Sequence, residues 1–212
     1  MFLLLLAIFA TRLGQGIPHY PLYLLLGIIV FNFFQQTTTE STKIIQNSKI
    51  IKSINFPKEA LIGAVILKNL FSHILEIILF LIIAFFFKAP LAGILFYPGV
   101  LLVFSFFCLG ISLALSALTV YFVDLENIWA FICRLLWFGT PIFYTIAGQT
   151  KLFLLNLLNP LYYFITIARD FVIHAKTPEL WLILAACCYS LLTLIIGLAV
   201  FGRLKSRLAE LI

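Results

Sequence analysis

One polar, lysine-containing stretch interrupts a chain that otherwise consists mainly of apolar segments. It covers residues 37–59 and contains four lysines, Lys43, Lys49, Lys52 and Lys58. The chain is 64% hydrophobic and 10% charged, with a mean hydropathy of +1.17, whereas an ordinary soluble domain is roughly 45–50% apolar. Because about 20 residues cross a bilayer as a helix, a chain of this length holds about five or six spans. The sequence therefore predicts an all-α, polytopic membrane helical bundle.

The distribution of basic residues predicts the orientation of the spans. Lysine and arginine beside a span stay on the cytoplasmic side, so residues 37–59 and the C-terminal tail are expected there. The basic residues of that tail are Arg203, Lys205 and Arg207. By alternation, the segments expected on the external side are residues 11–19, 88–90 and 145–179.

The first ten residues are apolar but only about half as long as a span. They lack the basic start and the cleavage site of a signal peptide. We therefore expect the sequence to begin inside span one, without the cytoplasmic segment that would precede it.

The polar stretch has the pattern of helices. Threonine hydroxyls that bond to their own backbone allow residues 35–39 to continue the apolar helix before them. Thr37 and Glu40 also have capping-box spacing, and isoleucines at helical period follow. A new helix is expected to begin at Pro57, with Glu59 in its first turn. Two interpretations remain open: an amphipathic connector in the headgroup layer, or a coupling element that docks on a motor protein.

Ionisable residues inside predicted spans indicate polar contacts or function, because each costs about 2.5–3.5 kcal/mol at the bilayer centre on insertion scales. Lys68, His73 and Glu76 lie in the span after residue 57, and Arg134 lies two turns into the span of residues 128–144. They could form contacts between helices, line a hydrated path or couple transport to protons. An ion-coupled carrier or membrane-embedded enzyme that uses Glu76, His73 and Arg134 is therefore kept as the alternative function.

Residues 145–179 contain apolar pieces interrupted by polar ones. Asn159 and Pro160 fall in the middle, and Arg169 and Asp170 follow. Counting this segment as a full span would place the basic tail outside, against the distribution of positive charge. We predict two short helices that enter the outer half of the membrane and turn back. Irregular backbone at that depth must be buried in protein or face a hydrated cavity.

The remaining segments supply packing and turn signals. Small residues at 110–118 permit close helix contact in lipid, and a helix break is expected at Gly139-Thr140-Pro141. Asp124 is placed as the N-cap of the fifth span.

The four cysteines lie in apolar runs without metal-binding or CxxC spacing, so we expect them to pack as small hydrophobes. The net charge of +6 comes from basic residues at the ends of loops. This distribution is explained better by orientation of the chain in the bilayer than by nucleic-acid binding.

Four sequence stretches resemble the membrane subunit of type 2 ABC exporters, most closely the branch that exports lipid-linked polysaccharides such as O-antigen, capsule or teichoic acid. These stretches are NSKIIKSINFPKE, LSALTVYFVDLENIWAFICRLLWFGTPIFY, LNPLYYFITIARD and FGRLKSRLAE. The resemblance extends from Tyr20 to the C-terminus and depends on the order and spacing of the motifs. Two positions depart from the family pattern: Val123, where relatives carry arginine, and Arg134, where they are uncharged.

The resemblance implies a six-span permease of the cytoplasmic membrane with both termini inside. It implies a homodimer that works with two copies of a separate ATPase, to which ATP and magnesium bind; no cofactor is expected in this chain. The chain has no GxxxxGK[ST] phosphate loop, which agrees with a separate motor. The external segment 145–179 would be a gate, and 37–56 would be the coupling helix.

Two sets of site residues follow from this interpretation. The residues expected to couple to the ATPase are Lys43, Asn47, Lys49, Lys52, Phe56, Pro57 and Asp124. The residues expected along the path of a lipid-linked glycan are Arg134, Trp137, Phe143, Tyr144, Tyr162 and Tyr163. Aromatic rings suit the second role because sugar rings stack on their faces.

Overall fold

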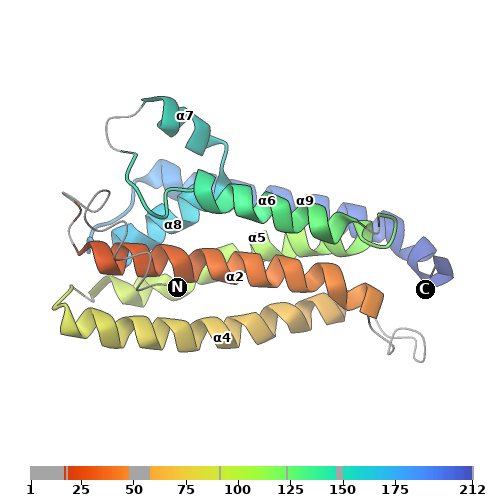
Figure 1. Ribbon diagram of the computed structural model, residues 1–212, viewed down its shortest axis with the longest axis horizontal. Helices are drawn as coiled ribbons and strands as arrows, with labels where there is room; N and C mark the ends of the chain where they lie inside the picture. The colour runs from red at the N-terminus through yellow and green to blue at the C-terminus, as the bar shows by residue number, and fades with distance from the viewer. Residues whose placement is uncertain are drawn as a thin grey trace.

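The computed structural model describes residues 17, 19–47, 58–90, 92–122, 124–146 and 150–211. These residues form helices that run side by side along one axis (Figure 1), which confirms the predicted all-α bundle. In chain order the elements are α2 (Tyr20–Asn47), α4 (Lys58–Phe86), the 3-10 helix η1 (Ala92–Phe96), α5 (Tyr97–Leu118), α6 (Leu125–Gly139), α7 (Thr150–Leu157), α8 (Pro160–Val172) and α9 (Leu180–Leu211).

Four helices in the described part are long and apolar enough to cross a membrane. These candidate spans are Tyr20–Lys43, Glu59–Phe86, Gly93–Leu118 and Leu180–Leu204. They correspond to the second, third, fourth and sixth predicted spans, and the first predicted span lies outside the described residues. The fifth predicted span is shorter than expected, because α6 has 15 residues and reaches only about 22 Å at 1.5 Å per residue.

Helix α6 ends where the sequence predicts a break. The backbone turns extended at Thr140, with ψ of 141°, and stays non-helical until α7 begins at Thr150 in the part that the structure describes. The backbone from residue 140 to 146, called here the 140–146 segment, therefore lacks helical hydrogen bonding. Its polar groups need partners from elsewhere in the protein.

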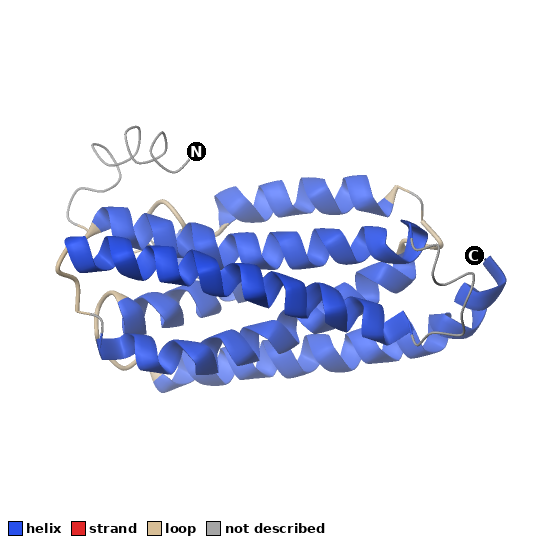
Figure 2. Cartoon of the chain, turned by 90° about the horizontal axis from the view of Figure 1, so that it is seen from below, coloured by secondary structure: helices blue, strands red, loops and turns tan. Residues whose placement is uncertain are grey.

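Helix α2 occupies the centre of the bundle. It contacts α4, α5, α6 and α8, and 67% of its candidate span is buried, against 22% for α4 and 17% for α9. Figure 1 shows α4 and α9 on different sides of it, and Figure 2 shows the bundle from below. Aromatic rings fill the space between helices: Phe34 of α2 stacks on Phe107 of α5 at 6.0 Å, and Phe107 meets Phe164 of α8 at 5.3 Å.

Helices α5 and α9 pack backbone to backbone, as the small residues at 110–118 predict. A Cβ added at Gly197 would overlap the backbone of Gly110, and one at Gly110 would overlap that of Thr193. Nearby, the Ser190 hydroxyl donates a 2.8 Å hydrogen bond to the carbonyl of Val103. Glycine at these positions is required by the close approach of the two helices.

The polar stretch does not begin as a separate loop. Helix α2 continues unbroken from the membrane segment to Asn47, and the hydroxyls of Thr38 and Ser41 donate to backbone carbonyls one turn earlier at 2.8 and 2.7 Å. This confirms the predicted continuation through residues 35–39. The capping box predicted from Thr37 and Glu40 is wrong, because both residues lie inside the helix. The rest of the predicted coupling segment, residues 48–56, lies outside the described residues.

Candidate functional site

Arg169 of α8 connects three parts of the protein at the Tyr20 end of α2. The side chain is buried, with 3% exposed. Its Nη1 donates to the carbonyl of Pro141 at 2.7 Å, and its Nη2 donates to the carbonyls of Ile142 and Tyr23 at 3.0 and 3.1 Å. The planar guanidinium group presents several donors in a fixed fork, so one side chain can satisfy several carbonyls.

Two tyrosines of α2 complete this arrangement. The Tyr20 hydroxyl donates to the carbonyl of Phe143, and the Tyr23 hydroxyl donates to that of Tyr144, both at 3.1 Å. The Arg169 Cζ also lies 3.4 Å from the centre of the Tyr23 ring, a cation–π contact. Together with Arg169, these residues bind four consecutive carbonyls, 141–144, and we call this group the arginine clamp.

Gly27 makes space for the clamp. It lies one turn after Tyr23 on α2, and a Cβ at this position would overlap the Arg169 guanidinium and press on Ile142. No role for Gly27 or Arg169 follows from the sequence pattern alone. The sequence shows an arginine in an apolar helix and, earlier in the chain, a Thr-Pro break. That these two features contact each other could not be inferred from it.

The predicted pair of short helices is confirmed. Helices α7 and α8 are bent by 107° at Asn159 and Pro160. The Asn159 Oδ1 accepts from the backbone N–H of Leu161 at 3.1 Å, and its Nδ2 donates to the Thr140 hydroxyl at 2.8 Å. Asn159 therefore caps α8 and attaches its start to the end of α6.

A polar cavity of about 350 Å³ lies beside the clamp. Asp170 and Lys176 form an ion pair of 3.1 Å at its edge, and burial lowers the pKa of His174 below its ordinary value, so this histidine is neutral at neutral pH. The side chains that line the cavity include Tyr23, Thr145, Tyr162, Thr166, Arg169, Asp170, His174 and Lys176. The cavity thus combines hydroxyls, aromatic rings and charged groups.

The opposite end of α2 is held by ion pairs, and we call Glu40, Lys43, Lys68 and Glu126 the ion-pair end. Lys43 lies 2.8 Å from Glu126 of α6, and Lys68 of α4 lies 2.7 Å from Glu40. The acceptor Thr38 Oγ1 also receives a 3.0 Å hydrogen bond from the Trp129 indole. All these contacts join α2 to its neighbours within residues 37–59, the lysine-containing stretch that we call the basic segment.

The structure places part of the predicted coupling set. Lys43 belongs to the ion-pair end, Asn47 is the last residue of α2, and Asp124 occupies the N-cap position of α6. The predicted Asp124 cap is only partly confirmed, because its side chain makes no capping hydrogen bond. The remaining members of the set, Lys49, Lys52, Phe56 and Pro57, lie outside the described residues.

The predicted path residues do not gather around one cavity. Trp137 and Phe143 meet edge to face at 5.4 Å, and Tyr144 takes part in the clamp through its carbonyl. Tyr162 lines the polar cavity, whereas the hydroxyl of Tyr163 donates to the carbonyl of Leu157. Arg134 is exposed on the surface of α6.

The residues of the alternative function also separate. His73 is buried, with its Nε2 2.7 Å from the Tyr97 hydroxyl and its Nδ1 3.9 Å from a carboxylate oxygen of Glu76. Lys68, which shares a helix face with Glu76, pairs with Glu40 instead. In the described residues Arg134 makes no hydrogen bond or ion pair with His73 or Glu76, so the three do not form one site. His73 and Glu76 form polar contacts within the bundle.

Comparison with known proteins agrees with this architecture. The model of the ABC-2 type transporter family matches residues 1–173. An O-antigen export system permease protein RfbA of Myxococcus xanthus is 24% identical over 208 residues, which is 96% of this chain and 80% of the relative. Two proteins of the same name from Klebsiella pneumoniae are 27% and 26% identical over 209 residues, with 97% of this chain and 80% of each relative covered.

The family match and the long apolar helices establish an integral, multi-pass membrane protein of the transporter class. The helical bundle with a bent pair of short helices fits the resemblance found in the sequence motifs. The chain belongs to the ABC-2 type transporter family, as a permease of the type 2 ABC exporter kind.

Proposed function

We propose that this chain is the transmembrane subunit of an ATP-driven exporter that moves a lipid-linked, O-antigen-type polysaccharide outward across the cytoplasmic membrane. The names of the relatives, which are O-antigen export permeases, support the substrate class. The observation that carries the mechanism is the continuity of α2, which joins the ion-pair end to the arginine clamp as one helix of 28 residues. At 1.5 Å per residue, such a helix is about 42 Å long.

In this mechanism the force enters at the basic segment. Two copies of a separate ATPase bind segment 37–56 on the cytoplasmic side and hydrolyse ATP there. Because the last part of α2 belongs to that segment, a movement of the ATPase displaces the ion-pair end. A continuous helix transmits the displacement to Tyr20 and Tyr23, whose hydroxyls hold the 140–146 segment.

The arginine clamp then determines how the external gate responds. Arg169 attaches α8 to the same carbonyls that the tyrosines of α2 hold. Movement of α2 therefore moves the 140–146 segment and α8 with it. The gate predicted at residues 145–179 opens when α8 and the bent α7 are displaced.

The export path lies between two copies of the chain. Ile128, Phe131 and Leu135 are exposed on one face of α6, and Arg134 lies on the same side of the helix. Since a charged side chain in contact with lipid is costly, this face is suited to a second copy and to the hydrated path between the copies. Along that path Arg134, Trp137 and Tyr144 would contact the glycan, and Tyr162 would contact it at the polar cavity.

The coupling role is tested by reversing charge in the basic segment. The Lys49→Glu/Lys52→Glu double variant is expected to lose co-purification of the ATPase and surface display of the glycan. The matched control is Lys88→Glu/Lys151→Glu, which makes the same charge change on the predicted external side and should preserve both. Unchanged co-purification and unchanged display in the Lys49/Lys52 variant would contradict the docking role.

A conservative change separates the export mechanism from the ion-coupled alternative. Glu76→Gln keeps the shape of the side chain and removes its charge. Export driven by ATP should then remain close to the wild-type rate in proteoliposomes. A carrier that moves protons through Glu76 would lose its activity and would need no ATPase.

A further inference from the structure

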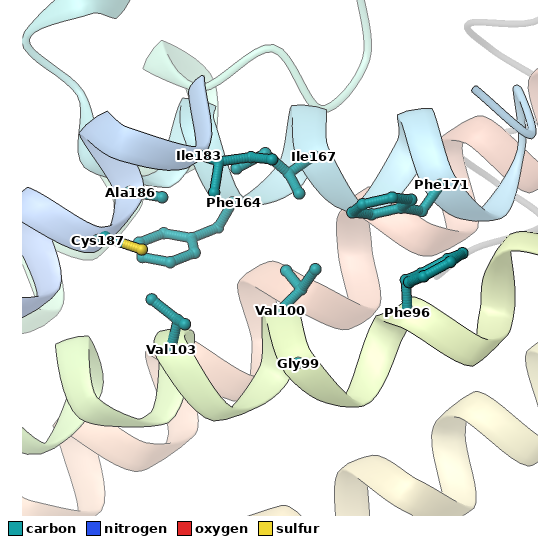
Figure 3. Close-up of a pocket in the computed structure, with 10 residues that line it drawn as sticks. All are labelled: Phe96, Gly99, Val100, Val103, Phe164, Ile167, Phe171, Ile183, Ala186 and Cys187. Carbon is teal, nitrogen blue, oxygen red and sulfur yellow. The ribbon is translucent and has the colours of Figure 1, made fainter. Parts of the chain in front are cut away.

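Helix α8 separates the polar cavity from a second, apolar one. Tyr162, Thr166 and Arg169 face the polar cavity, whereas Phe164, Ile167 and Phe171 face a pocket of about 210 Å³ between α5, α8 and α9 (Figure 3). The other residues that line this apolar pocket are Phe96, Gly99, Val100, Val103, Ile183, Ala186 and Cys187. None of the functional steps above uses it.

The lining of the apolar pocket excludes polar ligands. Every side chain in it is a hydrocarbon except the thiol of Cys187, so it offers no charged group and no strong hydrogen-bond partner. Apolar cavities of about 150 Å³ stay dry and bind hydrocarbons such as benzene. The pocket is larger than that, and burial of methylene groups in it is favourable.

The position of the apolar pocket indicates where its ligand comes from. Two of the three lining helices, α5 and α9, are candidate spans, and only 17% of the α9 span is buried. Phe96, which lines the pocket, is 59% exposed, and Gly99 is exposed at its edge. The proposed contact with a second copy is on α6, not on α9. With the second copy on α6 as proposed, the open side of this pocket faces bilayer hydrocarbon.

We propose that the apolar pocket binds the acyl chain of a phospholipid from the leaflet on the α8 side of the bilayer. A phospholipid is the solvent at this depth, so even weak binding fills the pocket by mass action. A flexible chain can enter beside the stacked rings of Phe96 and Phe171, whose centres are 5.2 Å apart, and end deeper in the pocket near Val103 and Cys187. The bound chain supports the face of α8 opposite the arginine clamp.

The test uses the purified protein in nanodiscs of phosphatidylcholine that carries a diazirine at the end of one acyl chain. After irradiation, mass spectrometry compares labelling of pocket residues with labelling of exposed residues on α4, such as Phe71. We expect pocket residues to be labelled more than these lipid-facing ones. Equal or weaker labelling of the pocket would overturn the proposal.

Pocket-filling variants provide the second measurement. Val100→Phe places a larger ring in the pocket, and Gly99→Leu adds a side chain where no atom lies within 4 Å of the new Cβ. Labelling of the pocket should fall about tenfold, the change expected when roughly two methylene groups lose their apolar surroundings. The control is Leu184→Phe, which adds similar volume on the exposed face of α9. It should leave pocket labelling unchanged.

A competition experiment distinguishes a phospholipid acyl chain from the hydrocarbon chain of an isoprenoid carrier. An equimolar polyprenyl phosphate should not displace the phospholipid label from the pocket. Displacement at that ratio would instead identify a site for an isoprenoid carrier and overturn the phospholipid assignment. Because the proposal depends on the arrangement of spans and not on the substrate, its failure would leave the export mechanism standing, and failure of export would leave the lipid site standing.

Discussion

The two ends of α2 are held by different chemistry. At the ion-pair end the contacts are exposed: the side chains of Lys43 and Glu126 are 49% and 36% accessible. At the other end Arg169 is buried and donates to three carbonyls. Exposed ion pairs contribute only about 0.2–1 kcal/mol, whereas loss of one partner from a buried charged arrangement costs about 3–5 kcal/mol. One end of the helix can change neighbours easily, and the other cannot.

Hydroxyl groups show the same contrast. Near the ion-pair end, Thr38 and Ser41 donate to the carbonyls of their own helix, and the Thr38 hydroxyl attaches α2 to α6 as the acceptor of one 3.0 Å hydrogen bond from the Trp129 indole. At the clamp, Tyr20 and Tyr23 donate to carbonyls more than 120 positions away in the sequence. The difference suits a helix that receives motion at one end and carries its attached gate at the other.

The largest expected effect is at Arg169. Arg169→Met removes the donors for three buried carbonyls, and each such group costs about 1–3 kcal/mol when it loses its partner. We expect the free energy of unfolding in detergent to fall by about 3–5 kcal/mol and export to stop. Arg169→Lys keeps the charge but not the fork, and it should give a smaller loss. Wild-type thermal stability in Arg169→Met would show that the clamp does not hold the gate.

A smaller effect is expected at Gly27. Gly27→Ala places a methyl group against the Arg169 guanidinium, and crowding of this kind costs about 1–3 kcal/mol. The control is Gly63→Ala on α4, where a Cβ meets no atom within 4 Å and the better helix propensity of alanine is worth up to about 1 kcal/mol. Thermal unfolding should show a lower stability for Gly27→Ala and an equal or higher stability for Gly63→Ala, each relative to the wild-type protein. Equal stability of both would mean that the space at Gly27 is not needed.

Removal of one clamp hydrogen bond should have a moderate effect. Tyr23→Phe keeps the ring beneath Arg169 but loses the bond to the Tyr144 carbonyl, at about 0.5–1.5 kcal/mol. Tyr97→Phe is the comparison variant, because the Tyr97 hydroxyl bonds to His73 of α4 and not to a carbonyl of the clamp. If the clamp couples α2 to the gate, Tyr23→Phe lowers export at a given ATPase rate and Tyr97→Phe does not. An equal amount of export per ATP hydrolysed in the two variants would argue against this role.

The smallest effect is expected at the ion-pair end. A double-mutant cycle with Lys43→Gln and Glu126→Gln should give a coupling energy of about 0.2–1 kcal/mol, which declines as salt screens the pair. Chemical unfolding at low and high salt provides the measurement. A coupling energy above about 3 kcal/mol would be typical of a buried pair and would remove the contrast between the two ends.

The sequence predicted local features well because length and hydropathy are local properties. The four long spans, the break at Thr140-Pro141 and the bent helices around Asn159 and Pro160 all follow from neighbouring residues. The clamp could not be predicted in this way, because Arg169 and Tyr23 are 146 positions apart. The two arginines illustrate the limit: the sequence drew attention to Arg134, which is exposed, whereas Arg169, noted mainly as an interruption, forms the buried contact.

Polar residues near Thr37 show a second limit. Their spacing resembles the start of a helix, but an unbroken helix satisfies the same hydroxyls through its own carbonyls. Glu40 was placed in a cap on its spacing from Thr37, whereas its partner in the structure is Lys68, which lies 28 positions later on another helix. Tertiary contacts therefore decided between two patterns that the local sequence allowed equally.

The central claim is that α2 and the arginine clamp move as one unit when ATP is hydrolysed. Spin labels at Gln36 on α2 and Thr145 beside the clamp, in transporter assemblies that contain one labelled copy of the chain, measure this directly by double electron–electron resonance. A second pair joins Gln36 to Leu192 on α9. The account predicts that vanadate trapping of the ATPase shifts the second distance and leaves the first unchanged; a shift in the first distance with the second unchanged would contradict it.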